Sequence, residues 1–585
     1  MGGPGGDARA FFHARSARRR HTGPMGQVEQ IEEAGALLAQ AEGRLADGDL
    51  HGAFAAYKAC LKAAPNFAPG LAGMGLFLAE HGDPGTAAQL LSQAMAEGDA
   101  AVRLRVAPAF ARLLEGLKPS AWDPALDRDL LVCLCSPTVD PQTLARVTAE
   151  TLLLKQARFD GTAATLDAMG RDPLWLAFLS RCVNVSAAME MRLNAVRTAV
   201  VEAGTGAGDA RDTPIGDLVA ALGISGFASE YVAQVRATDG AVAMLSRSPT
   251  LSEATALGEG ELKAQLIRRA IDEPARERTL AQSVPALTPD GADAISEAVK
   301  DQYEANPYPR WSAPPAPTPR RLSDAIAALP GLDGKAFAGR AETVLVAGCG
   351  TGFEPIDMAR MDPSLAITAM DLSRASLAHG MRVAEDLGLT RVQFVQGDIL
   401  ALDKVRARFD VVTSTGVLHH MARPEDGLAR LAGVLRPGGV VRLGLYSERA
   451  RAVVRAAHQL IRARGWTPVE ADIRAFRAHV LALPDGEPLA ALKESADFYS
   501  LSGCRDLVFH VQEHRYTPPE LGRLIAGAGL RLVGFEASPE ARAAFNSAFG
   551  AADPLDLSLW DTLEARRPTL FHGMYQVWAQ AGGAH

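Results

Sequence analysis

Two hydrophobic periodicities divide the chain. Up to about residue 285, apolar residues recur at helical spacing, for example in Leu152-Leu153-Leu154 and Leu174-Trp175-Leu176, and this spacing predicts helices that bury one face. From about residue 321 onward, short apolar runs of strand length alternate with helical patterns. Such alternation is typical of a parallel sheet covered by helices on both faces. The sequence therefore predicts a helical first half and an α/β second half.

The α/β half contains short apolar runs that suit strands, each bounded by polar residues, glycine or proline. Five of them come before residue 450, and two more suit the last two strands near the C-terminus. The runs are residues 344–347, 366–370, 392–395, 409–412, 440–445, 530–535 and 574–578.

The turn after the first run carries the most informative chemistry. Gly348-Cys349-Gly350-Thr351-Gly352 follows that run directly and precedes a helical pattern. Glycines let the backbone turn tightly and approach a ligand that a Cβ atom would exclude. Asp371 lies 21 residues beyond Gly350 (371 − 350), at the end of the second run, where an acidic side chain accepts hydrogen bonds from ribose hydroxyls. Because several nucleotide-binding folds share such a turn, the later motifs decide the family.

Three later motifs narrow the choice. Gly397-Asp398-Ile399 ends the third run, residues 413–420 follow the fourth, and Leu435-Arg436-Pro437-Gly438-Gly439 precedes the fifth. The "GD" after strand three and the "LRPGG" turn before strand five are not usual in dinucleotide dehydrogenases. In this order, the elements over about residues 335–450 resemble the S-adenosylmethionine-dependent methyltransferases of class I.

The resemblance implies a fold, a cofactor and a set of binding residues. The fold is a Rossmann-like sheet of seven strands whose last strand is antiparallel, and the cofactor is S-adenosyl-L-methionine. The glycines would let the backbone approach the amino-acid part and ribose of the cofactor, Asp371 would bind the ribose hydroxyls, and Asp398 would accept from the adenine amino group. Leu372 and Ile399 would flank the adenine ring. The expected cofactor-binding residues are Gly348, Cys349, Gly350, Thr351, Gly352, Asp371, Leu372, Asp398, Ile399 and Thr415.

His419 and His420 are the candidate catalytic residues. They follow strand four, at the mouth of the cleft where open α/β sheets bind ligands. A histidine there could deprotonate a hydroxyl or a thiol, or the pair could cap the next helix and line the donor pocket. Ser414-Thr415-Gly416-Val417 replaces the Asn/Asp-Pro-Pro-aromatic motif of amide and adenine methyltransferases, which disfavours an amide or adenine nitrogen as acceptor.

A polar concentration follows in the stretch after strand five. It suits either an acceptor pocket or a surface cluster of salt bridges. It consists of Arg505, Asp506, His510, Glu513, His514, Arg515 and Tyr516. We expect no metal site.

Helical repeats are predicted in residues 27–115. Gly48-Asp49 recurs as Gly82-Asp83, 34 residues later, and Ala53 recurs as Ala87. This pattern resembles tetratricopeptide repeats, in which small residues let paired helices pack closely. Such an array would present a groove for a protein or peptide, or it would dimerise the protein or brace the next domain.

An aromatic and proline-rich segment separates the two halves. Residues 302–311, QYEANPYPRW, resemble a segment found just before the catalytic domain in bacterial proteins that join tetratricopeptide repeats to a methyltransferase. It could fold over the cofactor cleft as a lid, or pack outside the sheet as a rigid strap. The predicted organisation is a disordered tail (1–25), repeats (26–118), a helical connector (119–290), the linker or lid (291–320) and a methyltransferase domain (321–585) with an insertion at about 447–510.

Composition limits the partners. The 585 residues carry a net charge of −8, which disfavours a general nucleic-acid binder. No uninterrupted apolar stretch reaches the roughly 18–20 residues of a membrane helix. Six cysteines without metal-ligand spacing indicate a reduced, cytoplasmic compartment. The arginine-rich start is either a targeting peptide or the product of a start codon upstream of Met25. The oligomeric state is not indicated.

Three functional hypotheses follow. The first is a methyltransferase whose acceptor is a protein or peptide recruited by the repeats. The second is a small-molecule O-methyltransferase whose repeats serve assembly. The third is a cofactor-binding scaffold that has lost turnover. The glycine turn, Asp371 and Asp398 argue for cofactor binding in all three.

Overall fold

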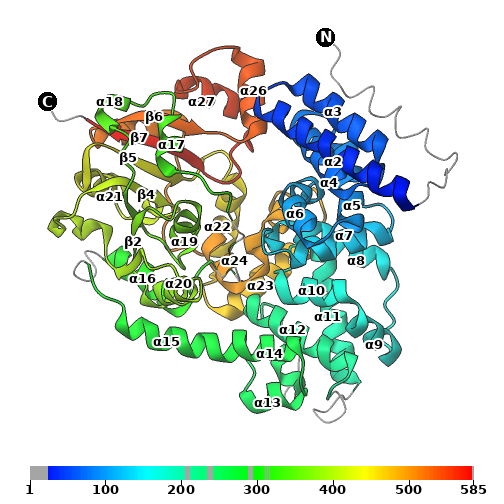
Figure 1. Ribbon diagram of the computed structural model, residues 1–585. Coiled ribbons are helices and arrows are strands. Elements are labelled where there is room, and N and C mark those ends of the chain that lie inside the picture. Colours follow the sequence, from blue (N-terminus) through cyan, green and yellow to red (C-terminus); the bar gives the residue numbers. More distant parts are fainter. Residues whose placement is uncertain are drawn as a thin grey trace. The chain divides into compact units, whose positions relative to one another are not determined.

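The computed structural model describes residues 24–203, 211–233, 241–287, 294–309, 311, 314 and 317–582. The chain forms two compact units, shown in Figure 1. The first comprises the described residues of Met1–Ser225, Ala237–Val242 and Ala256–Leu262, and the second those of Gly226–Arg236, Ala243–Thr255 and Lys263–His585. Residues 1–23 of the expected tail, the expected loop at 204–209, and Arg310 lie outside the described residues.

The first unit is helical. Its first helices are α2 (Pro24–Ala46), α3 (Leu50–Ala63), α4 (Ala68–His81), α5 (Pro84–Glu97) and α6 (Ala100–Glu115). They are followed by α7 (Pro124–Cys135), η1 (Pro141–Leu144), α8 (Ala145–Lys155), α9 (Ala163–Arg171), α10 (Pro173–Arg181) and α11 (Ala187–Glu202). This confirms a helical N-terminal region.

Equivalent aspartates start two of these helices 34 residues apart. Asp49 caps α3 by accepting from the backbone N–H of Gly52, and Asp83 caps α5 by accepting from those of Gly85 and Thr86. Such caps satisfy N–H groups that a helix start leaves without a partner. The 34-residue recurrence in the sequence is thus a recurrence of helix starts, while the identification as tetratricopeptide repeats stays a prediction.

Short helices join this region to the sheet. They are α12 (Pro214–Ala228), η2 (Ala241–Leu245), α13 (Leu251–Ala256), α14 (Glu261–Ile267), η3 (Arg268–Asp272), α15 (Glu273–Ser283), α16 (Ala294–Ala305), α17 (Leu322–Ala327) and α18 (Gly334–Phe337). Among the described residues, no helix is long and apolar enough to cross a membrane.

The second unit is built on a seven-stranded sheet with the order β3-β2-β1-β4-β5-β7-β6. The strands are β1 (Thr343–Ala347), β2 (Ala366–Asp371), β3 (Val392–Gln396), β4 (Phe409–Thr415), β5 (Leu435–Leu445), β6 (Leu530–Glu536) and β7 (Tyr575–Ala581). The first five pair in parallel, and β7 lies antiparallel between β5 and β6. This confirms the predicted sheet. The turn expected at residues 435–439 lies within β5, where the pairing with β4 shifts register.

Hydrophobic cores cover both faces of the sheet. Along β1, Val344 and Val346 belong to one core cluster, while Leu345 and Ala347 belong to the other, as the alternation of side chains along a strand requires. The covering helices are α19 (Phe353–Met361), α20 (Arg374–Asp386), α21 (Pro424–Gly433), α25 (Pro518–Gly527), α26 (Pro539–Phe549) and α27 (Leu557–Arg566), with the short η4 (Ile399–Lys404) and η5 (Leu418–His420).

Upstream segments pack directly on this sheet unit. In α15, Arg276 pairs with Glu385 and Asp386 of α20, and Glu277 pairs with Arg382. After α15, the backbone of residues 285–287 exchanges hydrogen bonds with Gln396 at the outer strand β3. At the opposite edge, the N–H of Gly331 donates to the carbonyl of Val533 in β6. The sheet unit therefore includes residues that the sequence analysis assigned to the helical connector.

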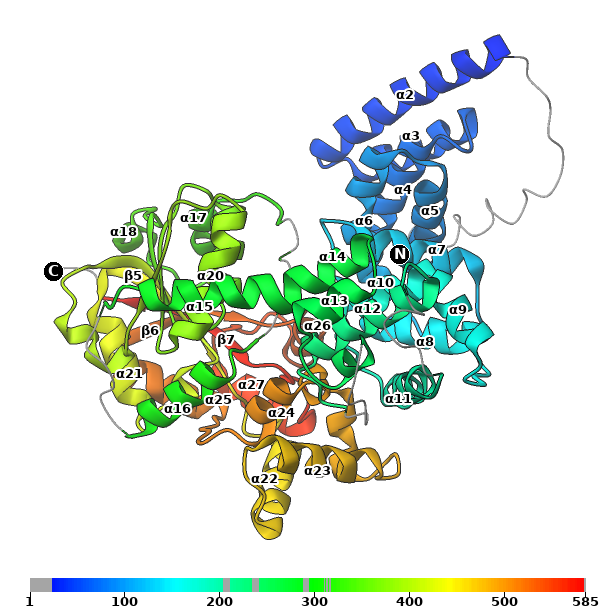
Figure 2. The ribbon, with the colours of Figure 1, turned by 90° about the horizontal axis from the view of Figure 1, so that it is seen from below.

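An insertion after β5 carries five further helices. They are α22 (Ala452–Arg464), α23 (Glu470–Leu481), η6 (Pro488–Glu494), η7 (Ala496–Tyr499) and α24 (Leu501–Val508). Figure 2 shows α22 and α23 standing off from the strands. The base of the insertion is closed because the backbone of Tyr516 pairs with that of Tyr446 and Glu448. This pairing returns the chain after α24 to the carboxyl end of β5.

Candidate functional site

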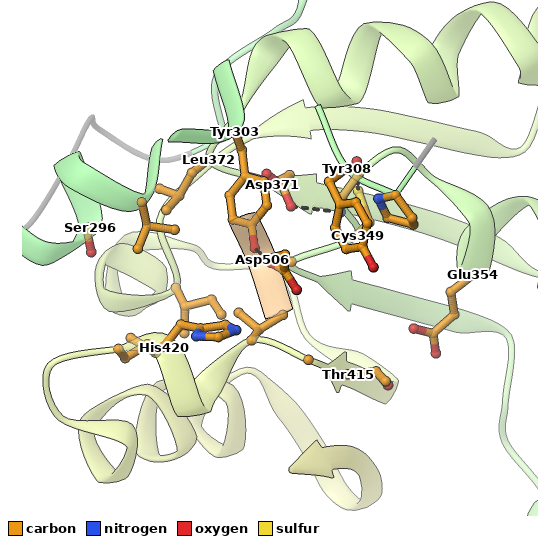
Figure 3. Close-up of a pocket in the computed structure, with 18 of the residues that line it drawn as sticks. Ser296, Tyr303, Tyr308, Cys349, Glu354, Asp371, Leu372, Thr415, His420 and Asp506 are labelled. Carbon is orange, nitrogen blue, oxygen red and sulfur yellow. Dashed lines mark hydrogen bonds between the residues drawn. The ribbon is translucent and has the colours of Figure 1, made fainter. Parts of the chain in front are cut away.

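A cavity of about 400 Å³ lies at the carboxyl ends of the parallel strands, the edge at which open α/β sheets bind ligands. Figure 3 shows its lining. We call the part near the turn after β1 the glycine-turn end, lined by Gly348, Cys349, Gly350, Asp371, Leu372, Asp398 and Ile399. We call the part formed by Tyr303, Tyr308, His420, Tyr446, Asp497 and Asp506 the tyrosine end; the two parts adjoin, because Tyr308 lies beside Asp371 and Cys349 and Tyr303 lies beside Leu372 (Figure 3). The other lining residues are Ile295, Ser296, Val299, Pro309, Phe353, Glu354, Gly397, Thr415, Gly416, Val417, Met421 and Met574.

The glycine turn depends on positions that other residues fit poorly. Gly352 has φ +87°, and a Cβ atom there would lie 2.9 Å from the Cα of Gly380. Gly350 has φ +53°, and its Cβ would lie 3.1 Å from the carbonyl oxygen of Tyr308. L-residues with a side chain adopt positive φ only at a cost. The sequence thus folds into a turn whose backbone, rather than its side chains, faces the cavity.

Asp371 holds this turn in place. It ends β2, and one carboxylate oxygen accepts from the N–H of Gly350 at 2.8 Å while the other accepts from the N–H of Ser373 at 2.9 Å. Burial raises the pKa of Asp371, and these hydrogen bonds work against that shift. Each oxygen keeps a second lone pair, so the carboxylate can still accept hydrogen bonds from a ligand.

Eight of the ten expected cofactor-binding residues line the cavity. Thr351 and Gly352 do not. The Thr351 hydroxyl donates to the carbonyl of Pro309 at 2.6 Å and accepts from the indole N–H of Trp311 at 2.9 Å. Thr351 therefore fixes the proline-rich segment against the glycine turn.

The residues of the aromatic segment are divided between the two arrangements predicted for it. Tyr303 and Tyr308 line the cavity, as a lid would, and their hydroxyls donate to Asp506 and Asp497, both at 2.5 Å. Trp311 does not line the cavity, and its ring packs edge-on against Phe353 and His379, as expected for a strap.

A carboxylate of the same segment anchors it. Glu304 accepts from the backbone N–H groups of Arg374 and Ala375 at 2.7 and 3.0 Å, at the start of α20. This contact fixes Tyr303 beside the cavity.

Only one of the two candidate catalytic histidines reaches the cavity. His420 lines it, whereas His419 is fully buried behind it, 4.1 Å between ring centroids from Tyr446. Burial lowers the pKa of His420 to about 4 and lowers that of His419 as well. Both imidazoles are therefore neutral at neutral pH.

The polar concentration in residues 505–516 separates into two kinds of residue. Asp506 lines the cavity, and the His510 ring stacks on that of His420 at 3.5 Å between centroids. The charged side chains of Glu513 and Arg515 instead form salt bridges, Glu513 with Arg451 and Arg515, and Arg515 also with Glu448. These salt bridges are not the surface cluster that was expected, because the side chains of Arg451 and Glu513 are only 8% and 1% exposed; the acceptor pocket stays a prediction.

Sequence reasoning missed several lining residues. Asp497, Tyr446 and Met574 carried no motif, because they come from the insertion, the end of β5 and the loop before β7. Burial raises the pKa of both Asp497 and Asp506, while the tyrosine hydroxyls act against that shift. The one available signal was position, since Tyr446 directly follows a strand at the ligand-binding edge.

Comparisons with known proteins identify the kind of domain that carries this cavity. The family model described as a methyltransferase domain matches residues 344–439. An uncharacterized protein of Synechococcus is 30% identical over 302 residues, which cover 48% of this chain and 71% of that protein. The chain belongs to the same family as that protein.

Known methyltransferases match over shorter lengths. An uncharacterized methyltransferase of Mycobacterium bovis is 31% identical over 100 residues, covering 17% of this chain and 48% of the relative. The chain thus spans about half the length of that relative. Among solved structures, PKMT2 from Rickettsia typhi in complex with AdoHcy is similar over 42% of this chain and 49% of that chain, at 15% identity and a TM-score of 0.32.

The enzyme is an S-adenosylmethionine-dependent methyltransferase. S-adenosylmethionine is its cofactor. In the methyltransferase, the glycine-turn end offers backbone atoms, two carboxylates and two apolar side chains, a set that suits a nucleoside with a charged amino-acid tail. Methyl transfer from a sulfonium needs positioning and exclusion of water more than covalent participation by the protein.

Proposed function

We propose that the methyltransferase transfers the methyl group of S-adenosylmethionine, bound at the glycine-turn end, to an oxygen of a small molecule bound at the tyrosine end. The observation that carries this proposal is the continuity of the two ends in one cavity. A donor at one end and an acceptor at the other would meet without leaving the protein interior.

On the donor side, the proposal assigns the ribose hydroxyls to Asp371 and the adenine amino group to Asp398, with Leu372 and Ile399 flanking the ring. Asp398 is buried, and one of its oxygens already accepts from the N–H of Leu400 at 2.8 Å.

On the acceptor side, charge favours an oxygen over an amine. Asp497 and Asp506 bring two carboxylates to the tyrosine end, and among the described residues neither forms a salt bridge. A nearby carboxylate stabilises the protonated form of an amine, which has no lone pair to attack with. A hydroxyl is neutral and keeps its lone pairs beside the same carboxylates.

The reaction is an in-line displacement. A lone pair of the acceptor oxygen forms the new bond to the methyl carbon, and the carbon–sulfur bond breaks with its electron pair moving to sulfur. The products are the methylated acceptor, S-adenosylhomocysteine and the proton of the hydroxyl. Of the two candidate histidines, only His420 lines the cavity. His420 is therefore the histidine that we assign to contact the acceptor.

A second candidate is a protein or peptide acceptor recruited by the N-terminal helices. It is favoured by the recurrence of capped helix starts at Asp49 and Asp83, which supports the hypothesis of tetratricopeptide repeats. Such repeats build concave surfaces that suit extended peptides.

Labelling separates the two candidates. The full chain is incubated with S-adenosylmethionine carrying a radioactive methyl group and a cell lysate, which is then split into macromolecular and small-molecule fractions. We expect label in the small-molecule fraction, lost in His420→Ala and kept in His51→Ala, whose histidine is exposed in the first unit. Label only in the macromolecular fraction would favour the protein acceptor. Cofactor binding without any label would favour the inactive scaffold.

A further inference from the structure

Three side chains at the tyrosine end converge from two separate parts of the chain. They are His420 on η5, Asp506 on α24 and His510 just after α24, and one ligand atom from each lies within 4.8 Å of the other two. Both histidines are buried. We infer that His420, Asp506 and His510 bind a divalent transition-metal ion, which holds the acceptor oxygen of the proposed methyl transfer.

The hydrogen bonds of the two histidines orient them as ligands. Nδ1 of His420 and Nδ1 of His510 lie 2.7 and 2.9 Å from the same backbone carbonyl, that of Gln512. A carbonyl oxygen only accepts, so both Nδ1 atoms carry the proton and both Nε2 atoms carry a lone pair. The N–H of Gln512 also lies 3.3 Å from Nδ1 of His510. That contact would require an Nδ1 without a proton. It is longer than the 2.9 Å contact between Nδ1 and the carbonyl, so the proton is assigned to Nδ1.

This arrangement is the one that metal-binding histidines use. A ligating imidazole donates its other N–H to a carbonyl or carboxylate, which fixes the tautomer and turns the free nitrogen toward the ion. Here one carbonyl performs that task for both rings. The segment around Gln512 is itself fixed, because the N–H of His514 donates to the carbonyl of His419 at 2.7 Å.

Two further features of the cluster call for a cation. The Nε2 atom of His510 is buried and has no hydrogen-bond partner, although a buried nitrogen lone pair normally has one. Asp506 accepts from Tyr303 but, within the described part of the chain, forms no salt bridge. A cation between these groups would occupy the lone pair and balance the carboxylate.

The donor set identifies the class of metal. Two imidazoles and one carboxylate with open positions are typical of Zn²⁺ and Fe²⁺ sites, whereas Mg²⁺ and Ca²⁺ prefer oxygen ligands. In a tetrahedral site with bonds of roughly 2.1 Å, ligand atoms are about 3.4 Å apart. The ligand atoms, which lie within 4.8 Å of one another, would close by up to about 1.4 Å around the ion, and the stacked rings of His420 and His510 would tilt apart so that both Nε2 lone pairs point at it.

The open coordination positions give the site its role. His420 and Asp506 line the cavity, as Figure 3 shows for both together with Tyr303. An ion held by the cluster presents its remaining positions to the tyrosine end. A hydroxyl that ligates such an ion loses its proton more readily and gains nucleophilicity. This assignment rests on the proposed function and narrows the acceptor to a molecule with a metal-binding oxygen.

Metal binding by the full chain tests the inference without knowledge of the acceptor. After treatment with a chelator, the protein is titrated with Zn²⁺ by calorimetry and with Co²⁺ by visible absorption. We expect one equivalent of each to bind, with Co²⁺ bands typical of nitrogen and oxygen ligands, and sodium azide to change those bands by entering an open position. Mg²⁺ should not compete. No stoichiometric binding of Zn²⁺ or Co²⁺ would overturn the inference, as would bands that azide leaves unchanged.

A matched pair of variants locates the site. His510→Ala should weaken Zn²⁺ binding by at least about 100-fold, while His514→Ala, four residues away and outside the cluster, should not change it. Asp506→Asn serves as a second variant that preserves side-chain size. If both His510→Ala and Asp506→Asn bind Zn²⁺ with wild-type affinity, the assignment is overturned. If the variants do not fold, the Co²⁺ spectrum of the wild-type protein tests the assignment instead.

Binding of S-adenosylhomocysteine distinguishes the two proposals. A protein that binds S-adenosylhomocysteine and labels small molecules but binds no Zn²⁺ or Co²⁺ contradicts the metal site alone. A protein that binds metal but not S-adenosylhomocysteine contradicts the proposed function.

Discussion

The two ends of the cavity are built in different ways. The glycine-turn end uses backbone atoms and short side chains that directly follow β1, β2 and β3. The tyrosine end uses long polar side chains from α16, the proline-rich segment, η5 and the insertion that contains α24. These side chains are held by hydrogen bonds to one another, for example from Tyr303 to Asp506. A site made by backbone is fixed by strand pairing, whereas a site made by side chains can change with each residue. Under the proposed function, the donor site is therefore built by the fold, and the acceptor site by the segments added to it.

The largest effect should come from disturbing the backbone of the glycine-turn end. Gly352→Ala adds a Cβ at positive φ and against the backbone of Gly380, and should lower the free energy of unfolding of the second unit by about 2–4 kcal/mol. The control is Gly388→Ala, also at positive φ (+67°) but with nothing within 4 Å, which should cost about 1 kcal/mol. The measurement is urea unfolding of the transition that S-adenosylhomocysteine shifts. Equal losses would show that the close approach does not matter.

Removing the carboxylate of the glycine-turn end comes next. Asp371→Ala loses the proposed contact to the ribose and the bond to the N–H of Gly350, which should cost about 2–3 kcal/mol, or roughly 30- to 150-fold in affinity for S-adenosylhomocysteine. Calorimetry measures this, with Asp403→Ala in η4 as the control. Unchanged affinity in Asp371→Ala would remove Asp371 from the donor site.

A smaller effect is expected at the tyrosine end. Tyr308→Phe removes the hydroxyl that donates to Asp497, and should lower stability by about 1–2 kcal/mol while changing the affinity for S-adenosylhomocysteine by less than about threefold. Tyr499→Phe is the control, because the Tyr499 hydroxyl donates to the carbonyl of Lys493 outside the cavity. A loss of cofactor affinity of tenfold or more in Tyr308→Phe would show that the two ends are not separable.

The smallest effect is expected from a substitution at the amino ends of the parallel strands, on the side of the sheet edge away from the cavity. Burial raises the pKa of Asp410, but hydrogen bonds from Thr343 and the guanidinium of Arg436 outweigh it, so the net pKa is lowered. A carboxyl with a lowered folded-state pKa adds stability above its unfolded pKa, and this stability is lost as the pH falls through the folded pKa.

Asp410→Asn should therefore cost about 1 kcal/mol at neutral pH. The difference in free energy of unfolding between Asp410→Asn and wild type should shrink below about pH 4. Unfolding in urea at several pH values measures it, and the affinity of the protein for S-adenosylhomocysteine should not change. A difference that grows on acidification would contradict the sign.

The same contrast explains what the sequence could predict. The glycine turn, Asp371 and Asp398 lie next to strands in a fixed order, so spacing along the chain reports their positions in space. Asp497 and Tyr446 meet at the tyrosine end only because the insertion folds back and Tyr516 pairs with Tyr446. No local pattern encodes that return. His419 and His420 show the limit most clearly: their rings are in contact, 4.2 Å between centroids, yet only His420 lines the cavity.

The outer strands of the sheet also bear on how the protein behaves in a crowded cell. Unpaired backbone groups on an edge strand can pair with another copy and start aggregation. Here the chain occupies both edges with its own upstream segments, at Gln396 of β3 through residues 285–287 and at Val533 of β6 through Gly331. A clipped chain that lacks residues up to 287 would expose the edge at Gln396. We therefore expect such a product to associate through its sheet, whereas the intact chain resists this.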